Sequence, residues 1–280
     1  MGPTHALSGA TAALAGIAWY SAAVAPVHPT VAIMGTVVAA GAALAPDIDS
    51  GRSTVVNSFG IFGRIFHIIA NSLSVAVYNL TKTRREEAKS DGHRTLFHTT
   101  AVALIAGVVT FLATLPTNIV ELYGREYTLG QLNAIILLSI YINLALGGLL
   151  EHQIKKARKK YGPYLLMVGS LALAALIALF IPSPEDSTFG LEIPGFGGTY
   201  AYLGIGVAFG WFIHLLGDAI TKMGVPMAWP IKVRGKRWYD VALPAFMRIR
   251  ADGTFEKVIL LPALTLSTTV LMVYTIIAYV

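Results

Sequence analysis

Seven runs of mostly apolar residues are spaced along this chain, and each is about as long as a bilayer's hydrocarbon core requires. Only helices and closed barrels satisfy their own backbone hydrogen bonds inside lipid. Charged residues make up 13% of the chain, against roughly 25% in soluble domains. We therefore predict an all-α, polytopic membrane helix bundle that forms a single membrane-embedded domain over residues 1–280. The expected transmembrane helices are 7–25, 29–45, 95–114, 130–150, 163–181, 200–217 and 258–280.

A further apolar segment, 55–80, is interrupted by polar side chains. These are Arg64, His67, Asn71 and Asn79. A helix with one apolar and one polar side lies at the membrane surface more readily than it crosses. Crossing would also place the next basic residues on the opposite side of the membrane. We therefore expect an interfacial or re-entrant helix here.

The basic residues indicate the orientation. Twenty of the 21 Lys and Arg residues lie in the stretches 46–97, 151–162 and 218–257. With seven alternating spans these stretches share one face, which the positive-inside rule identifies as cytoplasmic. We therefore expect an inner-membrane protein with a cytoplasmic N-terminus, an outside C-terminus and a basic cytoplasmic segment over 218–257. This explains the net charge of +6 through membrane lipids, without nucleic acid as a partner.

Histidine and aspartate collect on the same side. Four segments that are distant in the sequence contribute them at the cytoplasmic ends of the spans. The residues are His5, Asp47, Asp49, His93, His98, His214 and Asp218. Ionisable groups near membrane depth are costly and usually functional. Because the orientation was derived from Lys and Arg alone, this convergence is independent evidence for a site.

The local spacings favour metal binding. His214 and Asp218 are four residues apart and share one face of a helix. Arg94 and His98 have the same spacing at the expected start of the third span. Pro46 favours a helix end at Ala45, and an extended turn would let the next two carboxylates point to the same side. The chain has no cysteine, so its metal ligands must be His, Asp or Glu.

Three other histidines are less suited to the site. His28 lies in a loop expected outside, and His67 belongs to the amphipathic segment, where we expect it at the headgroup level. His152 is on the cytoplasmic side and remains a reserve candidate. We exclude these three from the predicted ligand set.

Four motifs together resemble the YdjM-like family of LexA-binding, inner membrane-associated, metal-dependent hydrolases. They are THALSG around His5, LAPDIDS around Asp47 and Asp49, GHRTLFHTT from His93 to His98, and HLLGDAITKMGVPMAWP from His214 to Pro230. The resemblance runs from residue 5 to residue 230, and the last motif is the most specific. It implies an integral membrane protein with a metal-dependent hydrolytic site.

The chain departs from the family pattern at three positions. Ser50 stands where the family commonly has histidine after the PDID motif. Thr95 and Phe97 stand where small and polar residues are common between the two histidines. A more distant likeness in ligand types to helical, zinc-dependent phospholipase C enzymes favours phosphoester chemistry.

The first hypothesis is therefore a hydrolase with zinc, or alternatively manganese, at the cytoplasmic membrane face. A bound metal lowers the pKa of water to about 7. Asp49 is the candidate general base, and Arg94 is the candidate clamp for an anionic phosphoester or lipid-derived substrate. Two alternatives stay open. The chain could transport a divalent cation or protons, or it could be a membrane scaffold that binds a cytoplasmic protein partner through its basic segment.

Overall fold

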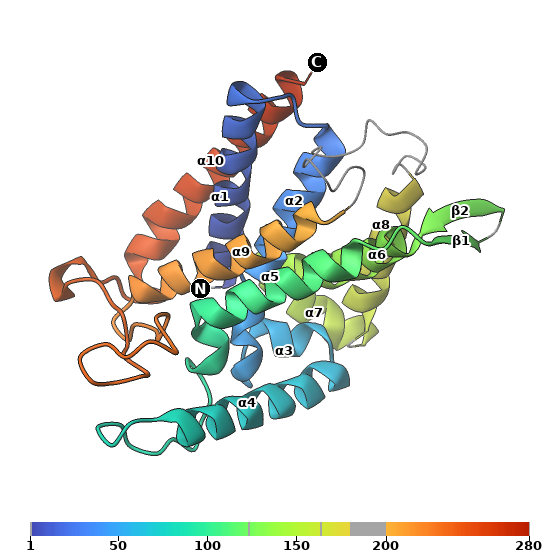
Figure 1. Ribbon diagram of the computed structural model, residues 1–280. Helices are drawn as coiled ribbons and strands as arrows, with labels where there is room; N and C mark the ends of the chain where they lie inside the picture. Colours follow the sequence, from blue (N-terminus) through green and yellow to red (C-terminus); the bar gives the residue numbers. More distant parts are fainter. Residues whose placement is uncertain (1, 123, 163, 180–199, 280) are drawn as a thin grey trace.

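The computed structural model describes residues 2–122, 124–162, 164–179 and 200–279. The chain is almost entirely helical, and its elements run from α1 to α10 with one small hairpin (Figure 1). The α-helices are α1 Gly2–Ala23, α2 Pro29–Ala42, α3 Thr54–Ser58, α4 Ile61–Thr81, α5 Thr100–Thr114, α6 Leu129–Leu149, α7 Glu151–Tyr161, α8 Leu165–Leu179, α9 Tyr202–Ala219 and α10 Leu261–Ile277. Short 3₁₀ helices cover Ala45–Asp49 (η1), Leu96–His98 (η2) and Ala245–Met247 (η3), and a π-helical turn covers Glu256–Leu260 (η4). Strands β1 Ile119–Leu122 and β2 Arg125–Thr128 pair antiparallel.

The helical membrane architecture agrees with the prediction, but the number of seven spans is not confirmed. Within the described residues, five helices are long and apolar enough to cross a membrane, or six if the bent pair α7–α8 is one span. Helix α1 is not among the five, since its many Ala, Gly, Ser and Thr residues make it less apolar. Helix α5 begins only at Thr100 and is too short, and the end of the predicted span 163–181 lies outside the described residues.

Helix α4 is not among the predicted spans, but it meets the length and hydropathy criteria for one. We expect it to lie at the membrane interface. It packs chiefly against η1, α3 and η2. Figure 1 shows it along the lower edge of the molecule, away from α1, α2 and α10. Its interfacial position stays a prediction, as does the single domain over the whole chain.

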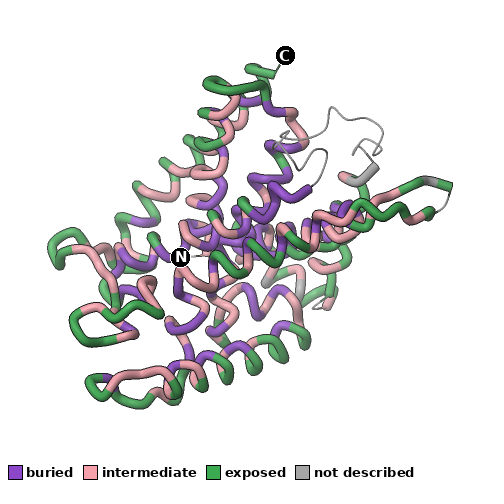
Figure 2. The backbone as a smooth tube through the Cα atoms, viewed as in Figure 1, coloured by how far each residue is buried: buried purple, intermediate pink, exposed green. Residues whose placement is uncertain are grey.

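The core of the bundle is built around α2, which packs against α1, α6 and α9. Small residues allow these helices to approach closely. A Cβ atom on Gly41 would lie 2.4 Å from the Tyr141 carbonyl oxygen, and one on Gly210 would lie 2.2 Å from the Ala39 carbonyl oxygen. Figure 2 shows the buried backbone concentrated in this region, whereas α4 and α10 are mostly exposed. The close packing holds the C-terminal ends of α2 and α9 side by side.

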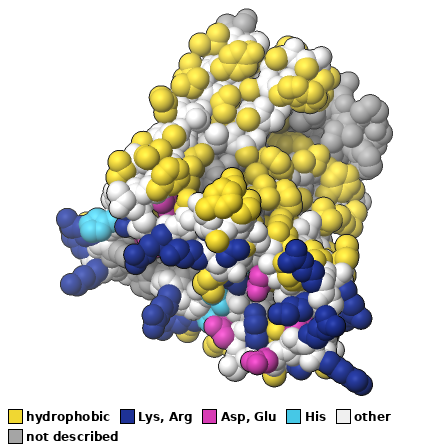
Figure 3. Space-filling view, turned by 90° about the vertical axis from the view of Figure 1, so that its left-hand side faces the viewer, with side chains coloured by type: hydrophobic (Ala, Val, Ile, Leu, Met, Phe, Trp, Pro, Cys, Tyr) yellow, Lys and Arg dark blue, Asp and Glu magenta, His cyan; other side chains and the backbone are white. Residues whose placement is uncertain are grey.

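The basic loop that follows α4, residues 82–95, packs against residues 232–240 of the basic segment 218–257. The Trp238 backbone N–H donates to Glu86 Oε1 at 2.6 Å, and the Arg237 guanidinium donates to the Thr81 carbonyl. Burial opposes ionisation of Glu86, but hydrogen bonds from the backbone N–H groups of Thr83 and Trp238 lower its pKa. Figure 3 shows Lys and Arg side chains gathered on the lower part of one face, below a largely apolar upper part. This separation agrees with the charge asymmetry of the sequence.

Candidate metal centre

The PDID motif forms the short helix η1 directly after α2. Pro46 lies in its first turn, where a missing N–H costs no hydrogen bond. The prediction of an extended turn is therefore wrong, because a 3₁₀ turn continues the chain direction of α2. Asp49 is buried at 1% exposure, while the side chain of Asp47 is 27% exposed. Both carboxylates nevertheless reach the same histidine, as described below.

The segment from His93 to Thr99 is not the first turn of a helix, contrary to the predicted start of the third span. Arg94 has a left-handed backbone with a φ of 54°, and a single 3₁₀ turn, η2, follows it. Thr99 then caps α5, since its hydroxyl accepts the Val102 backbone N–H. His98 consequently lies in the bend before α5, where it is completely buried.

Helix α9 presents His214 and Asp218 from adjacent turns, in agreement with their spacing. Both side chains are buried, at 0% and 2% exposure. His214 Nδ1 lies 2.8 Å from the Ala43 carbonyl oxygen at the end of α2. Because a carbonyl only accepts, Nδ1 carries the proton of the neutral ring, and Nε2 offers its lone pair to the site. This is the tautomer that a metal ligand needs.

His5 comes from the first turns of α1 and stacks on His214, with ring centroids 4.1 Å apart. Its Nε2 lies 3.6 Å from Asp218 Oδ1. A Cβ atom on Gly217 would lie 2.9 Å from the His5 ring, so only glycine leaves space for this imidazole. Gly217 is therefore part of the structure of the site, although its side chain carries no chemistry.

We expect Gly217→Ala to displace the His5 ring and to weaken metal binding, by at most the roughly 10- to 100-fold that loss of an outer partner costs. Isothermal titration of the purified protein with Zn²⁺ would measure this change. Gly16→Ala is the matched control, because a Cβ atom there meets nothing within 4 Å. An equal affinity in the two variants would contradict the assigned role of Gly217.

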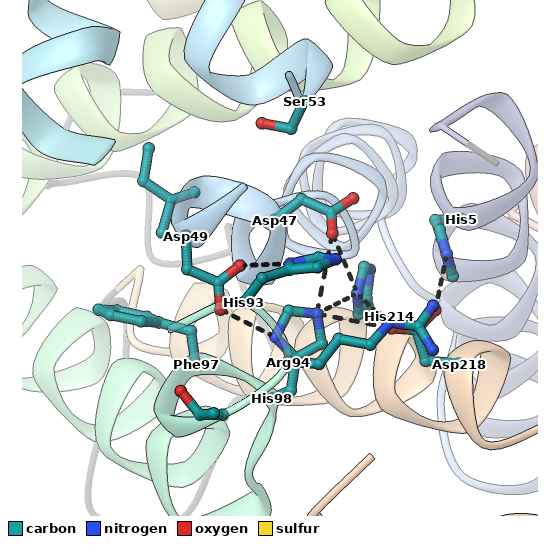
Figure 4. A network of polar contacts seen from close by, with 12 residues as sticks. His5, Asp47, Asp49, Ser53, His93, Arg94, Phe97, His98, His214 and Asp218 are labelled. Atoms are coloured by element: carbon teal, nitrogen blue, oxygen red, sulfur yellow. Dashed lines mark hydrogen bonds and ion pairs between the residues drawn. The ribbon is translucent and has the colours of Figure 1, made fainter. Parts of the chain in front are cut away.

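Four atoms from three segments form the centre of the cluster (Figure 4). His98 Nε2 and His214 Nε2 are 3.3 Å apart. Asp47 Oδ1 lies 3.7 and 3.8 Å from these two nitrogens, and Asp218 Oδ2 lies 3.5 and 3.6 Å from them. Ligand atoms in a tetrahedral site with metal–ligand bonds of about 2.0–2.1 Å lie about 3.3–3.4 Å apart. The distances from each carboxylate oxygen to the two nitrogens are therefore close to those around one tetrahedral ion.

A second group adjoins the first through His98. His98 Nδ1 lies 3.2 Å from Asp49 Oδ2, and His93 Nδ1 lies 3.0 Å from Asp49 Oδ1. Asp49 thus contacts both histidines of the GHRTLFHTT motif. A carboxylate behind a metal-binding imidazole commonly fixes its tautomer. The side chain of His93 is 34% exposed, so the cluster reaches the surface on this side.

The charges of the described residues fit a divalent cation. If all imidazoles are neutral, as metal ligands must be, the carboxylates of Asp47, Asp49 and Asp218 and the guanidinium of Arg94 leave two excess negative charges. Buried carboxylates are costly unless they are paired or bind a metal. Asp218 Oδ2, Asp49 Oδ2 and His98 Nδ1 are also buried without a well-directed hydrogen-bond partner. Three groups of His and Asp in this cluster could hold a metal ion, and together they contain all seven predicted ligands.

Arg94 contacts protein groups with both of its terminal nitrogens. Nη2 donates to Asp218 Oδ1 at 2.9 Å, and Nη1 donates to Thr221 Oγ1 and the Gly224 carbonyl. The guanidinium therefore orients Asp218. Its role as a substrate clamp stays a prediction.

The structure also clarifies residues outside the predicted ligand set. His28 and His152 belong to none of the candidate metal groups. His67 also stays outside them, but its Nδ1 donates to the backbone carbonyl of Ile48, which is part of the PDID motif. Phe97, which departs from the family pattern, stacks its ring on that of Trp211. The backbone carbonyl of Phe97 accepts a hydrogen bond from the Trp211 indole N–H. Sequence reasoning missed Gly217 and Asn71 as supporting residues. The only signal for Asn71 was its place as a polar residue within an apolar segment.

Comparison with known protein families gives a match over nearly the whole chain. The family model described as YdjM inner membrane protein matches residues 1–279. No curated protein and no solved structure matches the chain.

Proposed function

Since the chain belongs to the YdjM inner membrane protein family, we propose that it is an integral membrane, metal-dependent hydrolase. The observation that carries this proposal is a pair of imidazole nitrogens 3.3 Å apart, with an oxygen of Asp47 and an oxygen of Asp218 each 3.5–3.8 Å from both. The site belongs at the cytoplasmic face of the inner membrane, with the N-terminus inside and the C-terminus outside. The gathering of Lys and Arg on the lower part of one face supports this orientation (Figure 3).

Zinc is the proposed metal, with manganese as the alternative. Imidazole nitrogens and carboxylate oxygens at tetrahedral spacing suit Zn²⁺, and the chain has no thiolate to offer. Asp47, His98, His214 and Asp218 would hold this ion, with His5 beside them. Asp49 and His93 would hold a second ion or support the first. A bound divalent ion supplies Lewis acidity and lowers the pKa of a water molecule to about 7.

The pair of buried Asp49 and partly exposed His93 is the proposed acid–base group. With Nδ1 of His93 donating to Asp49, Nε2 is free to accept a proton from an attacking water. Asp49 keeps the ring in this tautomer and stabilises the imidazolium that forms. His93 thus accepts the proton, and Asp49 takes part in base catalysis through it. His93 lies between Asp49 and the surface.

The proposed substrate is an anionic phosphoester or a lipid-derived molecule that reaches the site from the cytoplasmic leaflet. Exposed basic side chains lie in the loops that follow η1 and α4, including Arg52, Arg84 and Arg85. Such cations attract phosphate groups and anionic lipids. Arg94 would contribute to the same positive field, in addition to orienting Asp218.

We expect Asp49→Asn to keep the ion held by Asp47, His98, His214 and Asp218 but to lose hydrolytic activity. The amide retains the shape of the carboxylate but stabilises an imidazolium poorly, and general acid–base catalysis typically contributes about 10²–10⁴-fold to the rate. Hydrolysis of para-nitrophenyl phosphate and of phosphatidic acid vesicles by zinc- or manganese-loaded protein would measure the effect. Metal content is determined on the same samples.

Asp240→Asn is the matched control, because this carboxylate is exposed and belongs to none of the candidate metal groups. Full activity in Asp49→Asn would remove the proposed base. If the wild-type protein bound no divalent metal, the proposal of a metal-dependent hydrolase would be wrong as a whole.

The two alternative functions rest on weaker observations. In the described part of α6, Asn143 is buried with neither amide atom hydrogen-bonded, but no continuous row of polar residues joins it to the cluster. Metal uptake into proteoliposomes would favour a transporter. Binding of a cytoplasmic protein through residues 232–240 that survives loss of the metal ligands would favour a scaffold.

A further inference from the structure

Two of the polar residues that interrupt the apolar segment of α4, His67 and Asn71, lie on the side that meets the two ligand-bearing loops. The first loop is 46–51, which contains Asp47 and Asp49, and the second is 91–93, which ends in His93. The His67 ring donates to the Ile48 carbonyl and packs against Gly51. Gly92 lies so close to α4 that a Cβ atom would come within 2.5 Å of the Ser74 side chain. Both loops therefore rest directly on this helix.

Asn71 connects the two loops. Its side-chain amide donates to the Asp49 carbonyl oxygen at 3.1 Å and to Asp91 Oδ1 at 2.8 Å. Asp91 Oδ1 also accepts the backbone N–H of His93 at 3.1 Å. The hydrogen bond from Asn71, together with that from the His93 backbone, lowers the pKa of the Asp91 carboxyl. One amide group thus joins the backbone of Asp49 to the turn that orients His93.

The other side of α4 is apolar and exposed. It carries Ile61, Phe62, Ile65, Phe66, Ile68, Ile69, Leu73 and Leu80, with exposures from 47% to 85%. An apolar face of this size is rare on a water-exposed helix. In an inner membrane protein it is expected to contact lipid, with Arg64 as an exposed cation on the same helix. Lipid on one side and the loops on the other would hold α4 in place.

We propose that α4 is the element that sets the geometry of the candidate metal centre, with Asn71 as its positioning residue between the two ligand-bearing loops. This inference rests on the proposed metal site but not on the reaction. Asn71 contacts no proposed ligand atom. It acts through the backbone of Asp49 and through Asp91, so its loss should loosen the loops without removing a ligand.

We expect Asn71→Ala to weaken Zn²⁺ binding by about 10- to 100-fold, as loss of an outer partner commonly does. The visible absorption spectrum of the Co²⁺-loaded protein should change as well, because it reports the arrangement of the ligands. Asn79→Ala is the matched control. Asn79 is on the same helix and also makes two hydrogen bonds, but both join it to the Lys89 backbone, away from the ligands.

Substitutions at Asp91 separate positioning from general stability. Asp91→Asn keeps the Oδ1 acceptor for Asn71 and His93, so it should retain both the Zn²⁺ affinity and the Co²⁺ spectrum. Asp91→Ala removes that acceptor and should reproduce the effects of Asn71→Ala. Equal effects of Asn71→Ala and Asn79→Ala, or equal effects of the two Asp91 variants, would overturn the assignment.

Hydrogen exchange detected by mass spectrometry provides a readout that needs no metal. Asn71→Ala should accelerate exchange in peptides covering both 46–53 and 90–96. Asn79→Ala should accelerate it mainly in 82–90. If the wild type binds no metal but this exchange pattern is observed, the proposed function fails and the positioning role stands. If metal binds and exchange in the two loops is unchanged by Asn71→Ala, the positioning role fails alone.

Discussion

Substitution of His214 and Asp218 together by alanine is expected to abolish metal binding. These residues contribute two of the four atoms at the centre of the cluster, His214 Nε2 and Asp218 Oδ2, and both residues are buried. The loss should exceed the roughly 10- to 100-fold that removal of an outer partner costs. Elemental analysis of purified protein should find the metal content reduced to background. Addition of Zn²⁺ should then no longer raise the melting temperature, since only a ligand that binds the folded state stabilises it.

Two further variants keep this prediction testable. His152→Ala is the control, because this exposed histidine belongs to none of the candidate metal groups and should leave metal content unchanged. The double variant also leaves Arg94 without its carboxylate partner, which could impair folding. Asp218→Asn is therefore measured in parallel, as it keeps the shape of the side chain but removes its charge. Undiminished metal in both the double variant and Asp218→Asn would remove the site from α9.

Gly210→Ala is expected to lower the free energy of unfolding by about 1–3 kcal/mol, the usual cost of overpacking. The added Cβ atom would lie 2.2 Å from the Ala39 carbonyl oxygen, and a backbone atom of a packed helix cannot move aside cheaply. Helices α2 and α9 must then separate. Because His214 lies one turn after Gly210 and bonds to the Ala43 carbonyl, metal affinity should fall as well. Thermal denaturation in detergent and Zn²⁺ titration would measure the two effects.

Gly16→Ala serves as the control for this substitution too. The position lies in α1 and has no neighbour within 4 Å of an added Cβ atom. Alanine favours a helix over glycine by about 1 kcal/mol, so this variant should be as stable as the wild type or more stable. If Gly210→Ala behaved like Gly16→Ala, the close approach of α2 and α9 would not be a determinant of stability.

Much of the candidate site could be predicted from the sequence, for an identifiable reason. Lys and Arg report which helix ends share a membrane face, so His5, Asp47, His98 and His214 could be grouped before any contact was known. The spacing of His214 and Asp218 then required a helix to bring them together. The local form of the other segments was harder to predict. Arg94 has a left-handed backbone, and its side chain contacts Asp218, Thr221 and Gly224, which are far away in the sequence.

The role of α4 could not be predicted from the sequence either. From the sequence, His67 and Asn71 are defects in an apolar segment, and they favour an interfacial helix. Their hydrogen bonds to Ile48 and Asp49 join positions about 20 residues apart in the chain, and no periodicity reveals such a pairing.

The sequence alone was sufficient to predict the features that depend on how residues partition between lipid and water. Apolar runs partition into lipid and cations stay on one side, so a helical membrane protein with His and Asp collected at one end follows from composition and order. Tertiary structure decided what depends on distances of a few ångströms. It brought an oxygen of Asp47 and an oxygen of Asp218 close to two imidazole nitrogens, placed Asn71 between two loops, and required glycine at positions 210 and 217. Such contacts arise from close packing between segments far apart in the chain, which hydropathy and charge do not encode.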